Sequence, residues 1–167
     1  MKAMSRILRH LCSGGFALRR RFGADTLAAI ERAVRDCETR HAGEIRFAVE
    51  AALPLGNLWR GQAPRERAID VFAQLRVWDT EHNNGVLIYV LLADRDVEIV
   101  ADRGVAGGVV ATDEWERCCR IMEDHFRAGR FREGAIAGIE AVADVLARHP
   151  PGPRSRANEL PDRPVVL

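Results

Sequence analysis

The stretch that most constrains the fold is GVLIYVLLADRDVEIVADRG, at positions 85–104. Its first part, Val86 to Leu92, is apolar at every position, which is typical of a strand covered on both faces. Only Asp94 to Asp96 separate it from a second apolar segment, Val97 to Asp102, so the second strand must return antiparallel to the first. The stretch therefore predicts the central hairpin of a sheet with helices on its faces.

The segments around this hairpin alternate between helical and strand patterns. Residues 44–50, EIRFAVE, alternate apolar and polar side chains as a half-buried strand does. A helical pattern between that strand and the central one predicts a parallel, right-handed crossover. The expected helices lie at about 25–40, 64–78, 112–128 and 131–149, with Thr112 as an N-cap, and a plain loop is expected at 53–63. The predicted fold class is α/β: an α/β/α sandwich with a small mixed sheet, in the order helix, strand, helix, strand, strand, helix, helix, with helices on both faces.

Charge and composition divide the 167 residues into a basic arm (1–24), one domain (25–149) and a tail rich in Pro and Arg (150–167). The net charge is +1, yet the arm holds six of the 25 basic residues and none of the 24 acids before Asp25. Met4 to Leu11 has one apolar helical face. Two interpretations remain open: the arm packs on its own acidic domain, or it contacts an anionic membrane surface. The basic residues concerned are Lys2, Arg6, Arg9, Arg19, Arg20 and Arg21. We expect a protein partner of unknown identity and no nucleic acid.

Features of the sequence favour the cytoplasm. The longest apolar run, Val86 to Ala93, is far shorter than the ~20 residues of a membrane-spanning helix. Gly14-Gly15 and three consecutive arginines interrupt any signal-peptide pattern. The four cysteines include no C-x-x-C pair, which favours a reducing compartment. We therefore predict a cytoplasmic protein, peripheral to the membrane if its arm binds lipid.

Polar residues are expected to gather at one edge of the sheet, where the two parallel strands begin and the hairpin's second strand ends. These residues are Glu44, Asp79, Thr80, Glu81, His82, Asn83, Asn84, Asp102 and Arg103. Carboxylate and amide oxygens suit Ca²⁺ or Mg²⁺, and the candidate ligands are Asp79, Asn83, Asn84 and Asp102. Carboxylates can also tune each other for acid–base chemistry. The alternative is that these side chains only satisfy backbone groups at the ends of helices and strands.

The remaining polar residues have simpler interpretations. Asp94 and Asp96 are expected to serve the tight turn of the hairpin. Arg46 and Glu50 are interpreted as the solvated face of a strand. No residue is singled out as catalytic.

Several short motifs together resemble the TPM domain family over roughly Asp25 to His149. They are Thr80 with NGVLIY at 84–89, Asp94 with DVEI at 96–99, DRGV at 102–105, Trp115, and FRAGRF at 126–131. The ending ELPDRP at 159–164 is similar to that of single-domain bacterial members. The resemblance implies an α/β/α sandwich, in agreement with the order of elements.

The resemblance also implies several functions. Some family members are acid phosphatases, some bind Ca²⁺, and others act in membrane-protein assembly or repair. This chain has Asn83 where secreted members often have Asp, and Ala106 near a position where they often carry an acid. The first hypothesis is a non-enzymatic binding or assembly/repair module at the cytoplasmic membrane face. The second is a phosphate-ester hydrolase that uses the polar edge, with a divalent cation.

Overall fold

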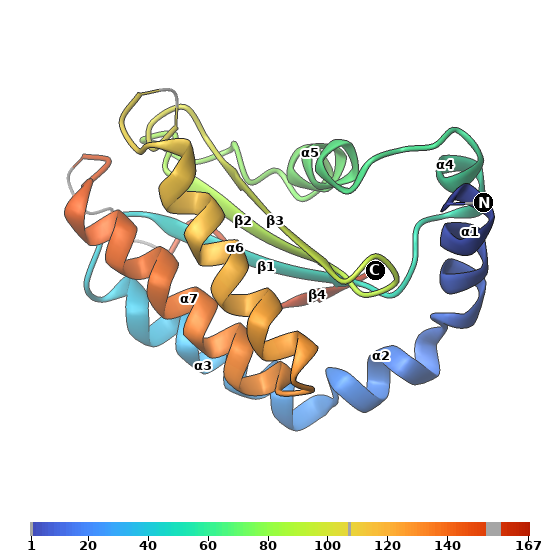
Figure 1. The fold of residues 1–167 in the computed structure, drawn as a ribbon. Coiled ribbons are helices and arrows are strands. Elements are labelled where there is room, and N and C mark those ends of the chain that lie inside the picture. The colour runs from blue at the N-terminus through green and yellow to red at the C-terminus, as the bar shows by residue number, and fades with distance from the viewer. Residues whose placement is uncertain (1, 107, 153–157) are drawn as a thin grey trace.

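The computed structural model of the chain describes residues 2–106, 108–152 and 158–167. At its centre is a four-stranded sheet in the order β3-β2-β1-β4 (Figure 1). The strands are β1 (Glu44–Glu50), β2 (Gly85–Leu91), β3 (Asp96–Ala101) and β4 (Val165–Val166). β1 is parallel to β2 and to β4, whereas β3 is antiparallel to β2. The structure confirms the predicted crossover, the predicted hairpin and the α/β class.

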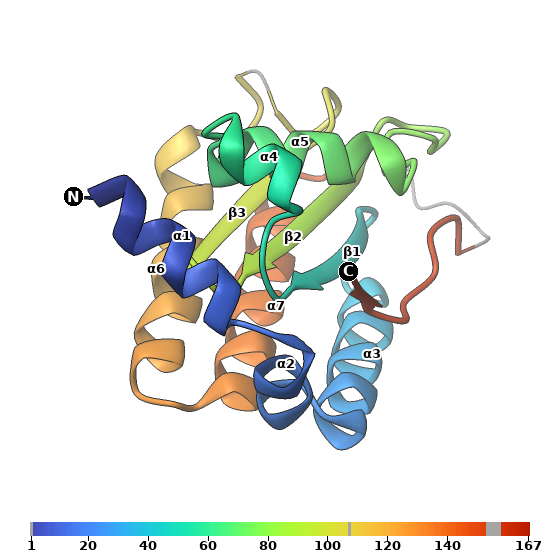
Figure 2. The same cartoon turned by 90° about the vertical axis from the view of Figure 1, so that its right-hand side faces the viewer.

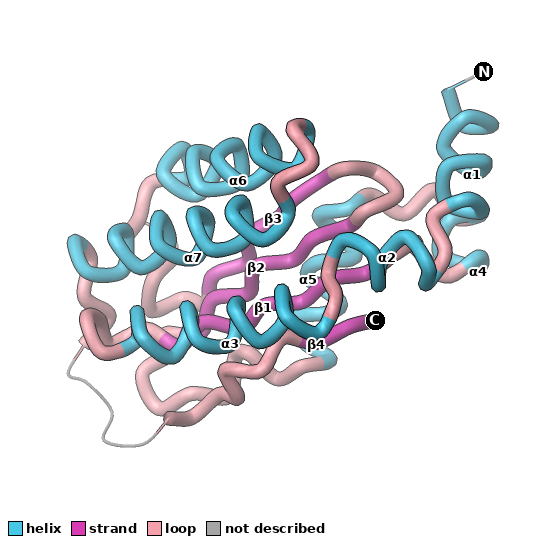
Figure 3. The backbone as a smooth tube through the Cα atoms, turned by 90° about the horizontal axis from the view of Figure 1, so that it is seen from below, coloured by secondary structure: helices cyan, strands magenta, loops and turns pink. Residues whose placement is uncertain are grey.

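Helices cover both faces of the sheet (Figures 1 and 3). One face carries α3 (Ala24–Glu38), α6 (Thr112–Arg127) and α7 (Phe131–Arg148), and the other carries α5 (Pro64–Gln74). Two further helices, α1 (Lys2–Cys12) and α2 (Gly15–Arg21), precede α3. The short helix α4 (Leu55–Trp59) lies beside α1 (Figure 2). Helical layers on both sides of a mixed sheet are the architecture that the sequence predicts.

Alternation along the strands divides the core into two halves. Side chains such as Phe47 and Ile88 pack under α3, α6 and α7, whereas Leu87 and Tyr89 pack with α5 and the segment that contains α4. From Val86 to Leu91, no side chain of β2 is more than 1% exposed. The uninterrupted apolar sequence of β2 follows from this burial on both faces.

Two short helices lie in segments where the sequence predicted none. α4 lies within the predicted loop 53–63, with Leu58 buried and Trp59 77% exposed. α2 lies within the arm, with Leu18 buried. Neither helix is long enough for apolar residues to recur at helical spacing, so periodicity does not reveal them.

Two helix ends also differ from the prediction. Ala111, not Thr112, occupies the N-cap of α6, so the predicted Thr112 cap is wrong. α5 ends at Gln74, short of the predicted end near Trp78. Arg76 there has a φ of 52°, which reverses the chain before Val77 packs into the core.

The last described residues form the fourth strand. β4 pairs in parallel with the second half of β1, and the Leu167 N–H donates to the Val49 carbonyl (3.0 Å). Leu160 is buried against the α5 side of the sheet. The sequence leaves open whether this segment docks, and the structure shows that it covers the outer edge of β1.

Two glycines allow close backbone contacts where the loop after α5 meets the sheet. A Cβ on Gly85 would lie 1.9 Å from the Val77 carbonyl oxygen. A Cβ on Gly104 would lie 2.5 Å from the carbonyl oxygens of His82 and Asn83. The loop therefore rests directly on the start of β2 and on the residues after β3.

We expect Gly85→Ala to lower the free energy of unfolding by about 2 kcal/mol or more, because the Val77 backbone must move. Gly56→Ala in α4 is the matched control, since a Cβ there meets nothing within 4 Å. That substitution should be neutral or stabilise by up to about 1 kcal/mol. Urea denaturation measures both, and equal effects would contradict the close contact.

Candidate functional site

The polar edge consists of Glu44, Asp79, Thr80, Glu81, His82, Asn83, Asn84, Asp102 and Arg103. Backbone pairing brings its segments together: Glu44 is opposite Gly85 in the ladder, and the Asp102 N–H donates to the Gly85 carbonyl (2.9 Å). The Arg103 Nε donates to Asn83 Oδ1 (2.9 Å). The loop at 79–84 thus lies alongside residues 102–103.

Thr80 and Asn84 are the buried part of this edge. Asn84 is completely buried, and its side-chain amide donates to the Ala42 carbonyl. Its backbone N–H donates to Thr80 Oγ1 (3.1 Å). The pair therefore fixes the loop to the residues before β1, because buried polar groups without partners are costly.

Glu44 and Glu81 of this edge hold the C-terminal segment. Glu44, 7% exposed, accepts a hydrogen bond from the Leu160 N–H (3.2 Å). In return, Glu159 accepts a hydrogen bond from the Glu81 N–H (2.7 Å). Burial raises the pKa of Glu44 above its ordinary value. These contacts anchor the segment that leads into β4.

The candidate ligands leave few free oxygens for a divalent cation. Asp79 is exposed, and Asn83 is bonded to the positively charged Arg103. Asp102 Oδ1 accepts the Arg103 N–H (2.7 Å). Two other buried oxygens, Asn84 Oδ1 and Asp102 Oδ2, have no hydrogen-bond partner among the described residues. Ca²⁺ takes about six to eight oxygens. Within the described ranges, no group of three or more His, Cys, Asp or Glu side chains could hold a metal ion.

One carboxyl near this edge has a strongly shifted pKa that the sequence did not indicate. Glu38, at the end of α3, accepts a hydrogen bond from the Ile45 N–H (2.9 Å). Burial, followed by the nearby Glu44 and Asp162 carboxylates, raises the pKa of Glu38 to about 8, although the Ile45 hydrogen bond lowers it. Glu38 is therefore mostly protonated at neutral pH.

At the opposite edge, Asp94 holds the N-terminal helix. Arg6 donates to it through Nε (2.9 Å) and Nη2 (2.8 Å), Arg9 lies 3.5 Å away, and His10 Nε2 lies 3.1 Å away. His10 Nδ1 accepts the Leu53 N–H (3.0 Å), so the proton of a neutral His10 is on Nε2, facing Asp94. Burial alone would raise the pKa of Asp94, but the hydrogen bonds from Arg6 and His10 hold it below its usual value.

Glu50, at the end of β1, forms a second buried charge cluster at this edge. It accepts two hydrogen bonds from Arg67 (2.9 Å each) and one from the Tyr89 hydroxyl (2.5 Å), and it is 3% exposed. The predicted solvated face is therefore wrong for Glu50, because Arg67 on α5 closes over it. Arg46 is also half-buried, and it donates to the Pro161 and Arg163 carbonyls.

The sequence contains a weak sign of the Asp94 contact. Arg6, Arg9 and His10 have the i, i+3, i+4 spacing of one helix face, which a single acid can bind. The partner could not be chosen from the sequence, since any of several loop acids would serve. The Glu50 cluster has no such sign, because EIRFAVE reads as an ordinary half-exposed strand.

Comparison with known proteins identifies the family. The sequence profile of the TPM domain matches residues 20–145. The chain belongs to the TPM domain family. The NMR structure of the BA42 protein from the psychrophilic bacterium Bizionia argentinensis has a TM-score of 0.73 and 33% identity, covering 86% of this TPM-domain chain and 94% of that chain. The predicted family and the predicted fold are both confirmed.

A second solved structure is also similar in sequence to this TPM-domain chain. The N-terminal domain of a protein from P. gingivalis is 28% identical, with a TM-score of 0.49 and 69% of each chain covered. No protein with a curated description matches the chain. These comparisons give the family and leave the activity open.

The shifted pKa of Glu38 predicts a pH dependence of stability. The folded protein keeps this proton up to about pH 8, whereas the unfolded chain releases it near 4.5, so stability falls as the pH rises through that interval. We expect Glu38→Gln to reduce the loss of Tm between about pH 5 and pH 8. Asp36→Asn, at an exposed position of the same helix, should keep the wild-type slope. An unchanged slope in Glu38→Gln would contradict the assignment.

Calcium titration tests the polar edge as a cation site. Because its free oxygens are few, we expect millimolar Ca²⁺ or Mg²⁺ to leave Tm unchanged, whereas an ion bound to the native state would raise it. Differential scanning fluorimetry measures this shift. An increase that Asp102→Asn abolishes and Asp94→Asn retains would show that the edge does bind a cation.

Proposed function

We propose that this TPM-domain protein is a non-enzymatic binding module that attaches to an anionic membrane surface through α1, α2 and α4. The observation that carries the proposal is the concentration of exposed apolar side chains on these three helices. The attachment fits an assembly or repair role at the cytoplasmic membrane face, which the family resemblance implies.

The docking of α1 leaves part of its apolar face in solvent. Arg6 and His10 turn toward Asp94, and Ile7 packs at the α5-side core. Leu8 and Leu11 belong to the same apolar face as Ile7, but each is 62% exposed. An amphipathic helix fixed in this way presents apolar side chains outward, as interfacial helices do.

Neighbouring helices extend this apolar surface, which we call the N-terminal surface. Its members are Leu8, Leu11, Phe16, Leu55 and Trp59. They are half of the ten large apolar side chains that are exposed among the described residues. Phe16 and Trp59 are 82% and 77% exposed, and an exposed Trp suits the boundary between headgroups and acyl chains. Large apolar side chains that are exposed on neighbouring helices commonly mark an interaction site.

The basic side chains of the arm that the structure describes divide into two groups, and that of Lys2 lies outside the described ones. Arg6 and Arg9 pair with Asp94, and Arg21 lies over the Phe131 ring (5.2 Å), so these three are engaged within the fold. Arg19 and Arg20 are exposed and have no ion pair among the described residues. Each free arginine near an anionic bilayer adds about 1 kcal/mol of attraction. The attachment would therefore be weak, reversible and sensitive to salt.

The other hypothesis, a phosphate-ester hydrolase, has less support. Glu44, Thr80, Asn84 and Asp102 direct their side chains at main-chain groups and hold the loops together. A hydrolase would need a nucleophile or an activated water at a common point.

Among the described residues, no helix is long and apolar enough to cross a membrane, so the proposed attachment is peripheral.

Co-sedimentation with vesicles tests this function. We expect the protein to sediment with vesicles of phosphatidylglycerol and phosphatidylcholine, and less with phosphatidylcholine alone. Trp59→Ala and the double variant Arg19→Glu/Arg20→Glu should each reduce binding severalfold, because one removes apolar contact and the other reverses the charge.

Matched controls exist on other parts of the surface. Trp78 is 50% exposed after α5, and Arg76 and Arg163 are exposed far from α2 in the sequence, with no ion pair among the described residues. Trp78→Ala and Arg76→Glu/Arg163→Glu should bind like the wild type. Membrane attachment through this surface is refuted if the wild type stays in the supernatant, or if the controls lose as much binding as the test variants.

A further inference from the structure

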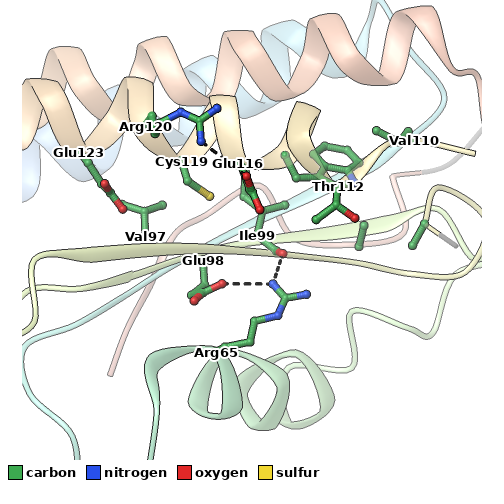
Figure 4. Close-up of a pocket in the computed structure, with 13 residues that line it drawn as sticks. Arg65, Val97, Glu98, Ile99, Val110, Thr112, Glu116, Cys119, Arg120 and Glu123 are labelled. Carbon is green, nitrogen blue, oxygen red and sulfur yellow. Dashed lines mark hydrogen bonds and ion pairs between the residues drawn. The ribbon is translucent and has the colours of Figure 1, made fainter. Parts of the chain in front are cut away.

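A groove of about 510 Å³ lies along β3, the strand at one edge of the sheet (Figure 4). Val97 and Ile99 of β3 form its apolar base, and α6 forms one wall with Trp115 and Cys119. Arg65 of α5 reaches the groove from the other face of the sheet, where it pairs with Glu98 (3.2 Å). None of these residues belongs to the polar edge or to the N-terminal surface.

The backbone of β3 is open on this side. Because the Asp102 N–H bonds to Gly85, alternate residues of β3 bond to β2, and the peptide groups of Val97, Ile99 and Ala101 point the other way. Arg65 donates to the Ile99 carbonyl, which shows that this carbonyl faces the groove. Arg65 occupies the Ile99 carbonyl, and the other outward groups of Val97, Ile99 and Ala101 have no strand partner among the described residues. Such an edge can pair with another extended chain, which would displace Arg65 from Ile99.

Two polar side-chain atoms beside the groove lack hydrogen-bond partners. Trp115 is 9% exposed, and its Nε1–H has no hydrogen-bond partner among the described residues. Asp96 Oδ2, next to the groove, is also buried without a partner in that part of the chain. Buried polar atoms without a partner are uncommon in native proteins.

Charge is distributed unevenly along the groove. The end near the hairpin turn gathers the carboxyl groups of Asp96, Glu98 and Glu123. Glu98 pairs with Arg65 and Glu123 with Arg127, whereas Asp96 has no ion pair among the described residues. Burial, followed by the charges of Glu98 and Glu123, raises the pKa of Asp96 to about 7. At the other end, Trp115 and Val110 supply apolar surface beside Thr112 and the ion pair of Glu116 with Arg120 (3.6 Å). A cationic side chain is therefore favoured at the first end and an aliphatic one at the second.

We propose that this groove binds an extended peptide segment of a partner protein, which adds to β3 as a strand and places a basic side chain by Glu123 and aliphatic side chains against Ile99 and Trp115. Backbone hydrogen bonds to Val97, Ile99 and Ala101 give the affinity, and the charge at one end sets the orientation. Membrane attachment uses different helices, so each proposal can fail while the other holds.

Two hexapeptide probes test the proposal: acetyl-Lys-Thr-Val-Thr-Val-Thr-amide and the peptide of reversed sequence. Titration followed by amide NMR should give saturable shifts at Val97, Ile99 and Ala101 and at the Trp115 indole N–H, for at least one peptide at millimolar concentration or below. The same peptide with alternate N-methylated residues should not bind, because it cannot form the strand hydrogen bonds. No saturable shift with either peptide would overturn the proposal.

Variants of the protein separate strand addition from other binding. Ala101→Pro removes one N–H that faces the groove while the ladder to β2 stays intact, and it should abolish binding. Glu123→Lys should weaken the lysine peptide about fivefold, whereas Asp124→Lys should not. Both acids pair with Arg127, but only Glu123 lines the groove. Equal binding by Ala101→Pro would overturn strand addition. Shifts at β3 that depend on protein concentration without peptide, together with a dimer by sedimentation, would assign the groove to a second copy of the chain instead.

Discussion

β2 has neither a face nor an edge in contact with solvent, and the rest of the fold is arranged around this burial. Its peptide groups must bond to neighbouring strands, because water cannot reach them. β1 satisfies one side and β3 the other. Both faces then need a helical layer, which α3, α6 and α7 supply on one side and α5 on the other. β4 covers β1, so β3 keeps the longer uncovered edge of the sheet.

Charged residues at the strand ends act mainly as anchors. Asp94 holds α1, and Glu50 joins β1 to α5 through Arg67. Such pairs are costly to break, because the remaining partner would be a buried charge without compensation. The anchoring of α1 has a consequence for the proposed function, because the docked helix leaves Leu8 and Leu11 exposed. The ion pairs of Arg6 and Arg9 with Asp94 therefore also hold α1 with its exposed leucines in the N-terminal surface.

Part of the candidate site could be predicted from topology alone. A parallel crossover followed by a hairpin requires that Asn83 and Asn84 lie beside Asp102 and Arg103, and the structure places them there. The hydrogen bonds of Glu44 and Glu81 at the same edge could not be predicted. These two residues bond to residues 159–160, which are far away in the sequence. For the same reason, the shifted pKa of Glu38 could not be inferred, since it depends on burial by segments that periodicity does not locate.

The sequence by itself determined the family, the class of fold and the order of the long elements. It did so because apolar periodicity and tight turns are local properties of the chain. Only the tertiary structure decided which charges are free and which are engaged, since Arg6 and Arg9 differ from Arg19 and Arg20 in their neighbours and not in their chemistry. The groove along β3 is likewise a tertiary feature, because an edge strand and a central strand differ only in what lies beside them.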